Sequence, residues 1–291
     1  MSMDIMLGSV NIDWKLVAAA VALMAGGGLL LGLIIGAVAR CFRVVGDSRV
    51  DLVTELLPGA NCGGCGKAGC QDFAKSVVSG ENPPGKCPVS TREQVSAIAL
   101  ALGVEVGEVV PMKAVVRCSG NLFTSDRVAY YKGINKCSSA MLVGGGPKLC
   151  RYGCLGMGDC ARKCPFGAIE IINNLAVIHE ELCIGCGSCA AVCPRGVIAI
   201  VPAAAHIHVF CNSPEKGAQK RQLCRSACLG CGKCVRKEPE KFELTAGLAK
   251  VKYDAAELPD MGTIEAVGCP TGALATTERH RLAAKKEAAV K

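Results

Sequence analysis

Cysteine spacing is the feature of this 291-residue chain that points to chemistry, since 21 of its residues are Cys. One run reads Cys183-x2-Cys186-x2-Cys189-x3-Cys193, followed by Pro194. In proteins with two iron–sulfur clusters, the first three thiolates of such a run bind one four-iron cluster and the fourth binds its neighbour. The run therefore predicts a pair of [4Fe-4S] clusters and a second cysteine group that completes the pair.

The second group lies just upstream and ends, like the first, in the pattern CPxGxI. Its members are Cys150, Cys154, Cys160 and Cys164. We assign one cluster to Cys164, Cys183, Cys186 and Cys189, and the other to Cys150, Cys154, Cys160 and Cys193. Cys150 is the unusual ligand, because ordinary spacing would place a cysteine at position 157, where Met157 stands.

A repeat indicates that one unit was duplicated, since the spacing Cys-x12-Cys-x3-Cys-x5-Cys begins at Cys137 and again at Cys211. The second copy has ordinary ligand spacing and predicts one further cluster. Its ligands are Cys228, Cys231, Cys234 and Cys269. Glu238 replaces the cysteine that precedes proline in the first copy, so we expect the neighbouring cluster to be absent there.

A separate site is predicted near the N-terminus by the spacing Cys-x2-Cys-x4-Cys-x16-Cys-Pro. Its ligands are Cys62, Cys65, Cys70 and Cys87. Glycines at positions 63, 64, 66 and 69 allow the backbone to fold tightly around inorganic sulfide. Four [4Fe-4S] clusters are thus expected in all.

Other readings of the cysteines remain open. Four thiolates also suit Zn²⁺, although Cys-x2-Cys-x2-Cys cannot be divided into two zinc knuckles. Four more cysteines either form a fifth site or are buried thiols of the core. They are Cys118, Cys137, Cys211 and Cys224. Cys41, at the membrane boundary, is expected to be neither a metal ligand nor a lipid attachment point.

No catalytic residue is predicted. The four histidines are scattered, Gly144–Gly146 lacks the strand–GxGxxG–helix context, and no Walker A sequence occurs. We therefore expect one-electron transfer between clusters, with no substrate-converting site and no flavin or nicotinamide bound by this chain.

The N-terminal segment 16–39 contains no charged or hydrogen-bonding side chain. As a helix it would reach about 36 Å, enough to cross a bilayer core of about 30 Å. A cleaved signal peptide is the alternative, but the apolar run is too long for one. Arg40, Arg43 and Arg49 follow the span and Lys15 precedes it, which places residues 40–291 in the cytoplasm. Gly28, Gly32 and Gly36 share a helix face that either receives a membrane partner or reflects common glycine usage.

The fold class expected is α+β, with a transmembrane helix, a small Fe–S domain and pseudo-symmetric ferredoxin-like domains. Thr91 and Gln94 predict a capped helix that Gly103 stops, and Asn173-Asn174 predicts a hairpin within 168–178. The expected divisions are an anchor at 1–39, a connector at 40–57, a small 4Fe-4S domain at 58–105, an intervening segment at 106–149, a two-cluster ferredoxin-like domain at 150–202, a degenerate one-cluster domain at 203–277 and a basic, solvated tail at 278–291.

The net charge of +8 would ordinarily suggest nucleic acid or anionic lipid as a partner. Each oxidised cluster bound by four thiolates carries about −2, so four clusters cancel this excess. We therefore expect no nucleic acid partner. A membrane-tethered zinc scaffold that binds nucleic acid is the competing hypothesis.

These motifs together resemble the B subunit of the Rnf electron transport complex over nearly the whole chain. The resemblance is carried by the single span, CGGCGKAGC, GGGPKLCRYGCLGMGDCARKCPFGAI and CIGCGSCAAVCP. It implies a cell-membrane complex that couples electron flow between reduced ferredoxin and NAD to movement of Na⁺ or H⁺. In that picture this chain takes electrons from soluble ferredoxin and relays them to partner subunits. A polyferredoxin subunit of another membrane reductase or hydrogenase is the alternative.

Overall fold

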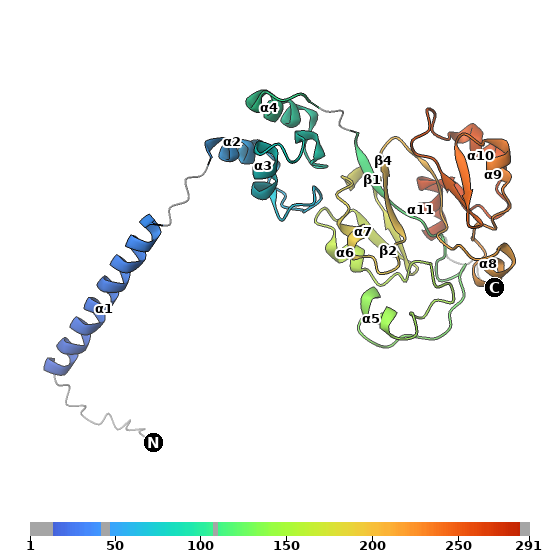
Figure 1. The fold of residues 1–291 in the computed structure, drawn as a ribbon. Coiled ribbons are helices and arrows are strands. Elements are labelled where there is room, and N and C mark those ends of the chain that lie inside the picture. The colour runs from blue at the N-terminus through green and yellow to red at the C-terminus, as the bar shows by residue number, and fades with distance from the viewer. Residues whose placement is uncertain (1–13, 42–46, 107–109, 286–291) are drawn as a thin grey trace, which may run out of the picture. The chain divides into compact units, whose positions relative to one another are not determined.

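The computed structural model describes residues 14–41, 47–106 and 110–285, shown as ribbons in Figure 1. It divides into two units, residues 1–47 and residues 48–291. Strands and helices are mixed in the second unit, which carries every predicted cluster ligand.

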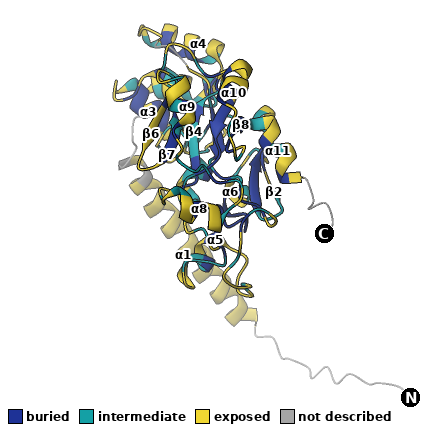
Figure 2. Cartoon of the chain, turned by 90° about the vertical axis from the view of Figure 1, so that its right-hand side faces the viewer, coloured by how far each residue is buried: buried dark blue, intermediate teal, exposed yellow. Residues whose placement is uncertain are grey.

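The first unit contains one helix, α1 (Trp14–Cys41). Its stretch Trp14–Val38 has a mean hydropathy of 2.3 and no buried residue, as Figure 2 shows by colour. The predicted span at 16–39 lies within this helix. The helix is long and apolar enough to cross a membrane.

The second unit begins with a small helical domain. Its elements are α2 (Ser48–Leu56), α3 (Cys70–Val78), the 3₁₀ turn η1 (Pro84–Lys86) and α4 (Arg92–Leu102). Val53, Phe73 and Ile98 form its core together with Cys87. The capping box between Thr91 and Gln94 is confirmed, and so is the left-handed Gly103 that ends α4.

The expected connector at 40–57 is wrong in its second half, because α2 belongs to this domain. Val50, Val53 and Leu57 recur at helical spacing, and Val53 is fully buried against α3. Residues 42–46 lie outside the described residues.

The next part pairs strands in two antiparallel sheets. Strand β1 (Met112–Val116) pairs with β4 (Ile198–Pro202), and β2 (Ile169–Ile172) forms a hairpin with β3 (Leu175–Ile178). Asn173 and Asn174 have φ of 48° and 58° in the hairpin turn, which confirms the predicted turn. The helices here are α5 (Cys137–Leu142), α6 (Asp159–Lys163), the 3₁₀ turn η2 (Glu180–Leu182) and α7 (Ser188–Val192).

The intervening segment expected at 106–149 is not separate from this part. Its strand β1 pairs with β4, with Met112 opposite Pro202 and Val116 opposite Ile198. A strand this short is stable only when a distant partner completes its hydrogen bonds, and the partner lies more than 80 residues ahead in the sequence.

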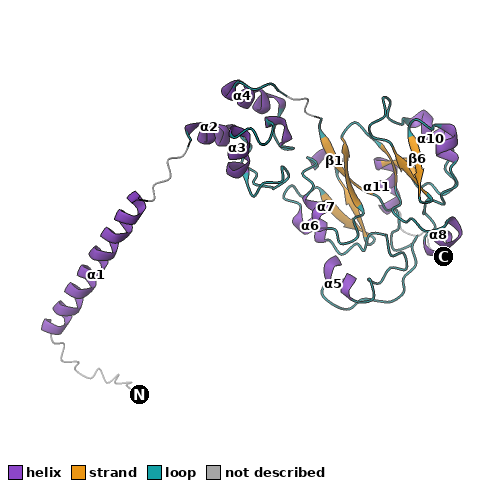
Figure 3. Ribbon diagram, in the orientation of Figure 1, coloured by secondary structure: helices purple, strands orange, loops and turns teal. Residues whose placement is uncertain are grey.

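The same order of strand, helix, hairpin, helix and strand recurs after residue 203. Figure 3 distinguishes helices and strands by colour. The sheets are β5 (Ile207–Val209) with β8 (Leu274–Thr276), and β6 (Phe242–Thr245) with β7 (Leu248–Val251). The helices are α8 (Gly217–Leu223), α9 (Lys233–Lys237) and α10 (Met261–Val267).

The last described helix, α11 (Thr277–Lys285), corrects the expected solvated tail at 278–291. His280 and Ala284 lie one turn apart and are buried. The His280 ring stacks on Phe210 with centroids 4.0 Å apart, and its Nε2 lies 2.8 Å from the Cys118 carbonyl oxygen. A buried stripe of two residues therefore packs this charged helix onto the core, while residues 286–291 lie outside the described residues.

Candidate metal centres

The four cysteines of the N-terminal motif line one cavity at the start of α3. They are Cys62, Cys65, Cys70 and Cys87. Asn61 accepts a hydrogen bond from the backbone N–H of Cys70 at 2.7 Å and so fixes the loop to the helix. Gly63 and Gly66 have φ of +73° and +82°, which lets the loop turn around the cavity as the sequence predicted.

This loop contacts the loop of the Cys183 run directly. A Cβ on Gly64 would stand 2.8 Å from the Cys186 carbonyl oxygen, so only glycine fits the approach. The Ser188 hydroxyl donates to the Cys62 carbonyl oxygen at 3.2 Å. The first and second cysteine sets are therefore neighbours.

The second set lines a cavity between β1 and α7, and its members come together as assigned from sequence. They are Cys164, Cys183, Cys186 and Cys189. The backbone N–H of Ala114 donates a hydrogen bond to the Cys183 sulfur at 3.3 Å. Burial, followed by the adjacent Cys183 and Cys186, raises the pKa of Cys189 to about 12. A metal bound at this set would favour the thiolate, because a coordinating thiol is deprotonated.

A third set forms around Cys160 and includes Cys137 instead of Cys150. Burial raises the pKa of Cys160 to about 12, and the neighbouring Cys154, Cys137 and Cys193 add to the increase. Cys137 is the first residue of α5 and packs against Met157. The structure therefore brings Cys137 near Cys160, where the sequence led us to expect Cys150, and the start of α5 packs against Met157 at the position of the missing cysteine.

Asp159 fixes that helix start. Its carboxylate accepts a hydrogen bond from the backbone N–H of Ser138 at 3.0 Å and pairs with Arg162 at 2.5 Å. Burial would raise the Asp159 pKa, but the hydrogen bonds from the backbone N–H groups of Ser138 and Cys137 outweigh it and lower the pKa. An ionised Asp159 thus positions Cys137 beside Cys160.

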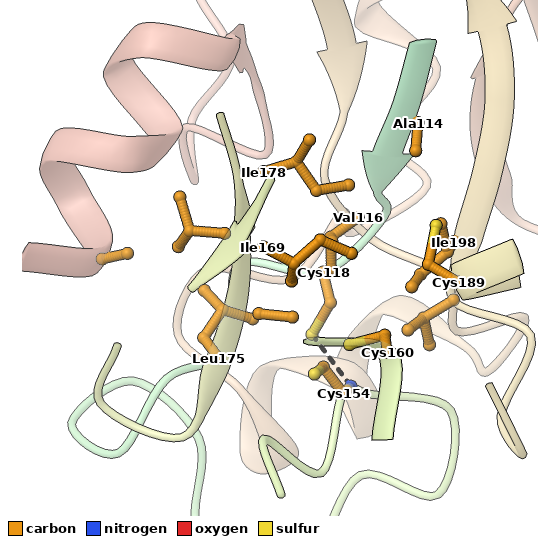
Figure 4. Close-up of a cluster of buried hydrophobic side chains, with 14 residues drawn as sticks. Ala114, Val116, Cys118, Cys154, Cys160, Ile169, Leu175, Ile178, Cys189 and Ile198 are labelled. Carbon is orange, nitrogen blue, oxygen red and sulfur yellow. Dashed lines mark hydrogen bonds between the residues drawn. The ribbon is translucent and has the colours of Figure 1, made fainter. Parts of the chain in front are cut away.

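Cys150 lies instead beside Cys118. A Cβ on Gly153 would stand 3.5 Å from the sulfurs of both Cys118 and Cys150. The backbone N–H of Cys154 donates to the Cys118 sulfur at 3.3 Å, the dashed line in Figure 4. Sequence spacing carried no signal for this neighbour, because Cys118 reaches it only through the pairing of β1 with β4.

The cysteines of the last motif surround one cavity, and they are Cys228, Cys231, Cys234 and Cys269. Burial raises the Cys234 pKa, and Cys228 and Cys231 add to the effect. A Cβ on Gly230 would stand 2.2 Å from the Gly247 carbonyl oxygen, so this loop packs tightly on the β6–β7 turn.

The donors of these sites are cysteine thiols, which suit both Zn²⁺ and iron–sulfur clusters. Across residues 14–41, 47–106 and 110–285, no three Cys, His, Asp or Glu side chains form a group that could hold a single metal ion. The spacing Cys-x2-Cys-x2-Cys in the Cys183 run is typical of a four-iron cluster, so the donor set fits such a cluster.

Comparison with protein families gives two matches. Residues 57–89 match a family described as a putative Fe-S cluster, and residues 176–199 match a 4Fe-4S binding domain. These ranges contain the complete N-terminal motif and the complete Cys183 run. Iron–sulfur chemistry is thus supported at both.

Comparison with curated proteins gives relatives that cover most of the chain. The B subunit of the ion-translocating oxidoreductase complex of Methanosarcina acetivorans is 36% identical over 256 residues, which are 87% of this chain and 96% of that protein. The B subunit of the proton-translocating ferredoxin:NAD(+) oxidoreductase complex of Clostridium ljungdahlii is 40% identical over 69% of this chain and 72% of its own length. The Na(+)-translocating counterpart of Acetobacterium woodii is 38% identical over 69% of this chain and 61% of its own length.

Proposed function

This chain belongs to the family of B subunits of ion-translocating oxidoreductase complexes, and on that basis we propose that it is the iron–sulfur electron-transfer component of such a complex. It takes electrons from reduced ferredoxin and relays them to partner subunits towards NAD, while the complex moves Na⁺ or H⁺. The observation that carries this proposal is the convergence of complete four-cysteine sets on separate cavities of one unit.

Three ligand sets follow the sequence motifs and a fourth uses Cys137. The Cys62, Cys183 and Cys228 motifs supply the first three, with Cys164 completing the second. The fourth set is Cys137, Cys154, Cys160 and Cys193. A four-iron cluster bound at each set supplies one-electron chemistry.

The chain's own residues determine what surrounds each site. Cys87, Cys154, Cys160, Cys189 and Cys234 are each less than 10% exposed, so water is largely excluded from one side of every set. The backbone N–H of Ala114 donates a hydrogen bond to the Cys183 sulfur. Hydrogen bonds to sulfur and burial are two of the means by which a protein adjusts the potential of such a site.

The arrangement of strands supports a ferredoxin-like reading of both halves. In each half the first strand pairs with the last, and a hairpin lies between two helices. We propose that the halves are pseudo-symmetric, and that the second retains one ordinary cluster because Glu238 replaces the cysteine before Pro239.

We propose that α1 anchors the chain in the cell membrane in a single pass. Its apolar length supports spanning, and the arginines at positions 40, 43 and 49 favour a cytoplasmic location for the cluster-binding unit. Soluble ferredoxin would then reach the sites from the same side.

The proposal is tested on full-length protein purified without oxygen in detergent. We expect a brown preparation with at least about sixteen irons and equal sulfide per chain. Low-temperature EPR should show the signals of reduced clusters after addition of reduced ferredoxin. A colourless, zinc-containing preparation, or one that reduced ferredoxin leaves unchanged, would contradict it.

A further inference from the structure

We propose that Cys118, Cys150, Cys211 and Cys224 bind a fifth four-iron cluster, at a site between the two strand-containing halves. The inference rests on the proposed function and extends it. It accounts for every cysteine of the chain except Cys41.

The four side chains converge on one cavity. All four line it, together with Phe210 and two lysines. A Cβ on Gly120 would stand 3.4 Å from the Cys224 sulfur and 3.6 Å from the Cys118 sulfur. Since a Cβ on Gly153 would touch the sulfurs of Cys118 and Cys150, glycines on two sides leave room among the thiols.

Each half of the unit contributes the same pair of positions. Cys118 follows β1 by two residues, and its N–H donates to the Val116 carbonyl oxygen at 2.8 Å. Cys211 follows β5 by two residues and donates likewise to Val209 at 2.9 Å. Cys150 and Cys224 then occupy equivalent places in the repeat. The two strand ends and two loops therefore form a site related by the duplication, which argues against four unrelated core thiols.

The charges around the cavity favour an anion within it. Lys148 and Lys220 are 7% and 1% exposed and line the cavity. The Lys148 ammonium donates to the Gly120 and Cys154 carbonyl oxygens, and that of Lys220 donates to the Gly247 carbonyl oxygen at 2.8 Å. These partners are neutral, and burying two cations without a counter-charge is costly. A four-iron cluster with four thiolates carries about −2, which matches two lysines.

The site lies in direct contact with a cysteine set on each side. The N–H of Cys154 donates to the Cys118 sulfur, and Cys154 belongs to the Cys160 set. On the other side, the backbone N–H of Cys228 lies against the Cys211 sulfur, and Cys228 belongs to the last cysteine set. A cluster here would receive one electron from one neighbouring set and give it to the other, so the second half would be connected to the first.

The assignment is tested by pairing cysteine substitutions in full-length protein purified without oxygen. Wild-type protein should contain about twenty irons per chain. Cys118→Ala and Cys150→Ala lie in one site, so the double variant should lose about four irons and the two single losses should not add. Cys118→Ala and Cys137→Ala lie in different sites, so their losses should add. Cys41→Ala is the matched control and should lose none.

Three other results would contradict the fifth site, and one would contradict the proposed function. About sixteen irons in wild type, with none lost from Cys118→Ala, would show buried thiols and overturn the inference while the proposed function stands. One zinc lost with Cys118→Ala/Cys150→Ala, or additive losses for that pair, would also overturn it. Wild-type protein without iron would instead refute the proposed function.

A milder variant guards against misfolding. Cys224→Ser retains an oxygen ligand, so we expect an unchanged iron count and an altered EPR spectrum for one cluster. The signals of the Cys62 site should persist and report that the protein is folded. An EPR spectrum identical to that of wild type would contradict ligation by Cys224.

Discussion

Replacing Gly156 with alanine tests how tightly the cysteine loops pack on the hairpin turns. Gly156 lies between Cys154 and Cys160 and has φ of +67°. A Cβ there would stand 2.1 Å from the Asn174 carbonyl carbon and 2.2 Å from its oxygen. Ordinary contacts begin at 3.4 Å, so the loop or the hairpin must move by more than 1 Å.

Gly167→Ala is the matched control, because Gly167 has φ of +63° and open space where its Cβ would stand. Both substitutions place alanine in the left-handed backbone region, which should lower the free energy of unfolding by about 1 kcal/mol. Gly156→Ala adds a backbone overlap of about 2–3 kcal/mol. For a unit of this size, the midpoint temperature of thermal unfolding should fall by about 2–4 °C for Gly167→Ala and by about 8 °C or more for Gly156→Ala.

The assay follows the visible absorbance of anaerobic protein during heating, at one scan rate for both variants. Gly156→Ala should also lose iron at the Cys160 set before the Cys62 set. Equal midpoints for the two variants would refute the close approach of the loop to the hairpin.

Three further predictions concern the other sites. Cys189→Ala should remove one cluster and leave the signals of the Cys62 site intact; loss of all EPR signals together would contradict independent sites. Asp159→Ala should release the start of α5 and reduce the iron content of the Cys160 set. Glu170→Ala, which removes an exposed carboxylate on β2, should leave the iron content unchanged. Equal iron contents in the two variants would contradict the role of Asp159 in positioning Cys137. Burial, followed by the charge of Lys113, lowers the pKa of His208 to about 4. As the pH falls below about 6.5, the unfolded chain therefore binds a proton at this histidine before the folded chain does. The free energy of unfolding should decrease between about pH 6.5 and pH 4. The loss reaches about 3 kcal/mol, and His208→Gln should show a weaker dependence by circular dichroism; parallel curves for the two proteins would exclude His208 as the cause.

Local signals in the sequence predicted the elements that depend on neighbouring residues. Thr91 with Gln94 indicated the start of α4, Asn173-Asn174 indicated the hairpin turn, and an unbroken apolar run indicated α1. In each case the chemistry that determines the structure lies within a few residues. The N-terminal motif likewise supplied a complete set of four cysteines, and the Cys183 run supplied three of the four in its set.

The ligand sets that the sequence did not predict depend on contacts between distant segments of the chain. The 74-residue repeat aligned Cys137 with Cys211, yet in the fold Cys118 follows β1 as Cys211 follows β5. No spacing could show this, because β1 finds its place only by pairing with β4. The exchange of Cys137 and Cys150 between sites has the same origin.

The position of α11 has a consequence for biogenesis. The helix places His280 on Phe210 and against the Cys118 carbonyl oxygen. Because α11 follows every cysteine motif in the sequence, it can dock only after those motifs have been synthesised. Docking of α11 therefore completes the burial of Phe210 and of the backbone at Cys118.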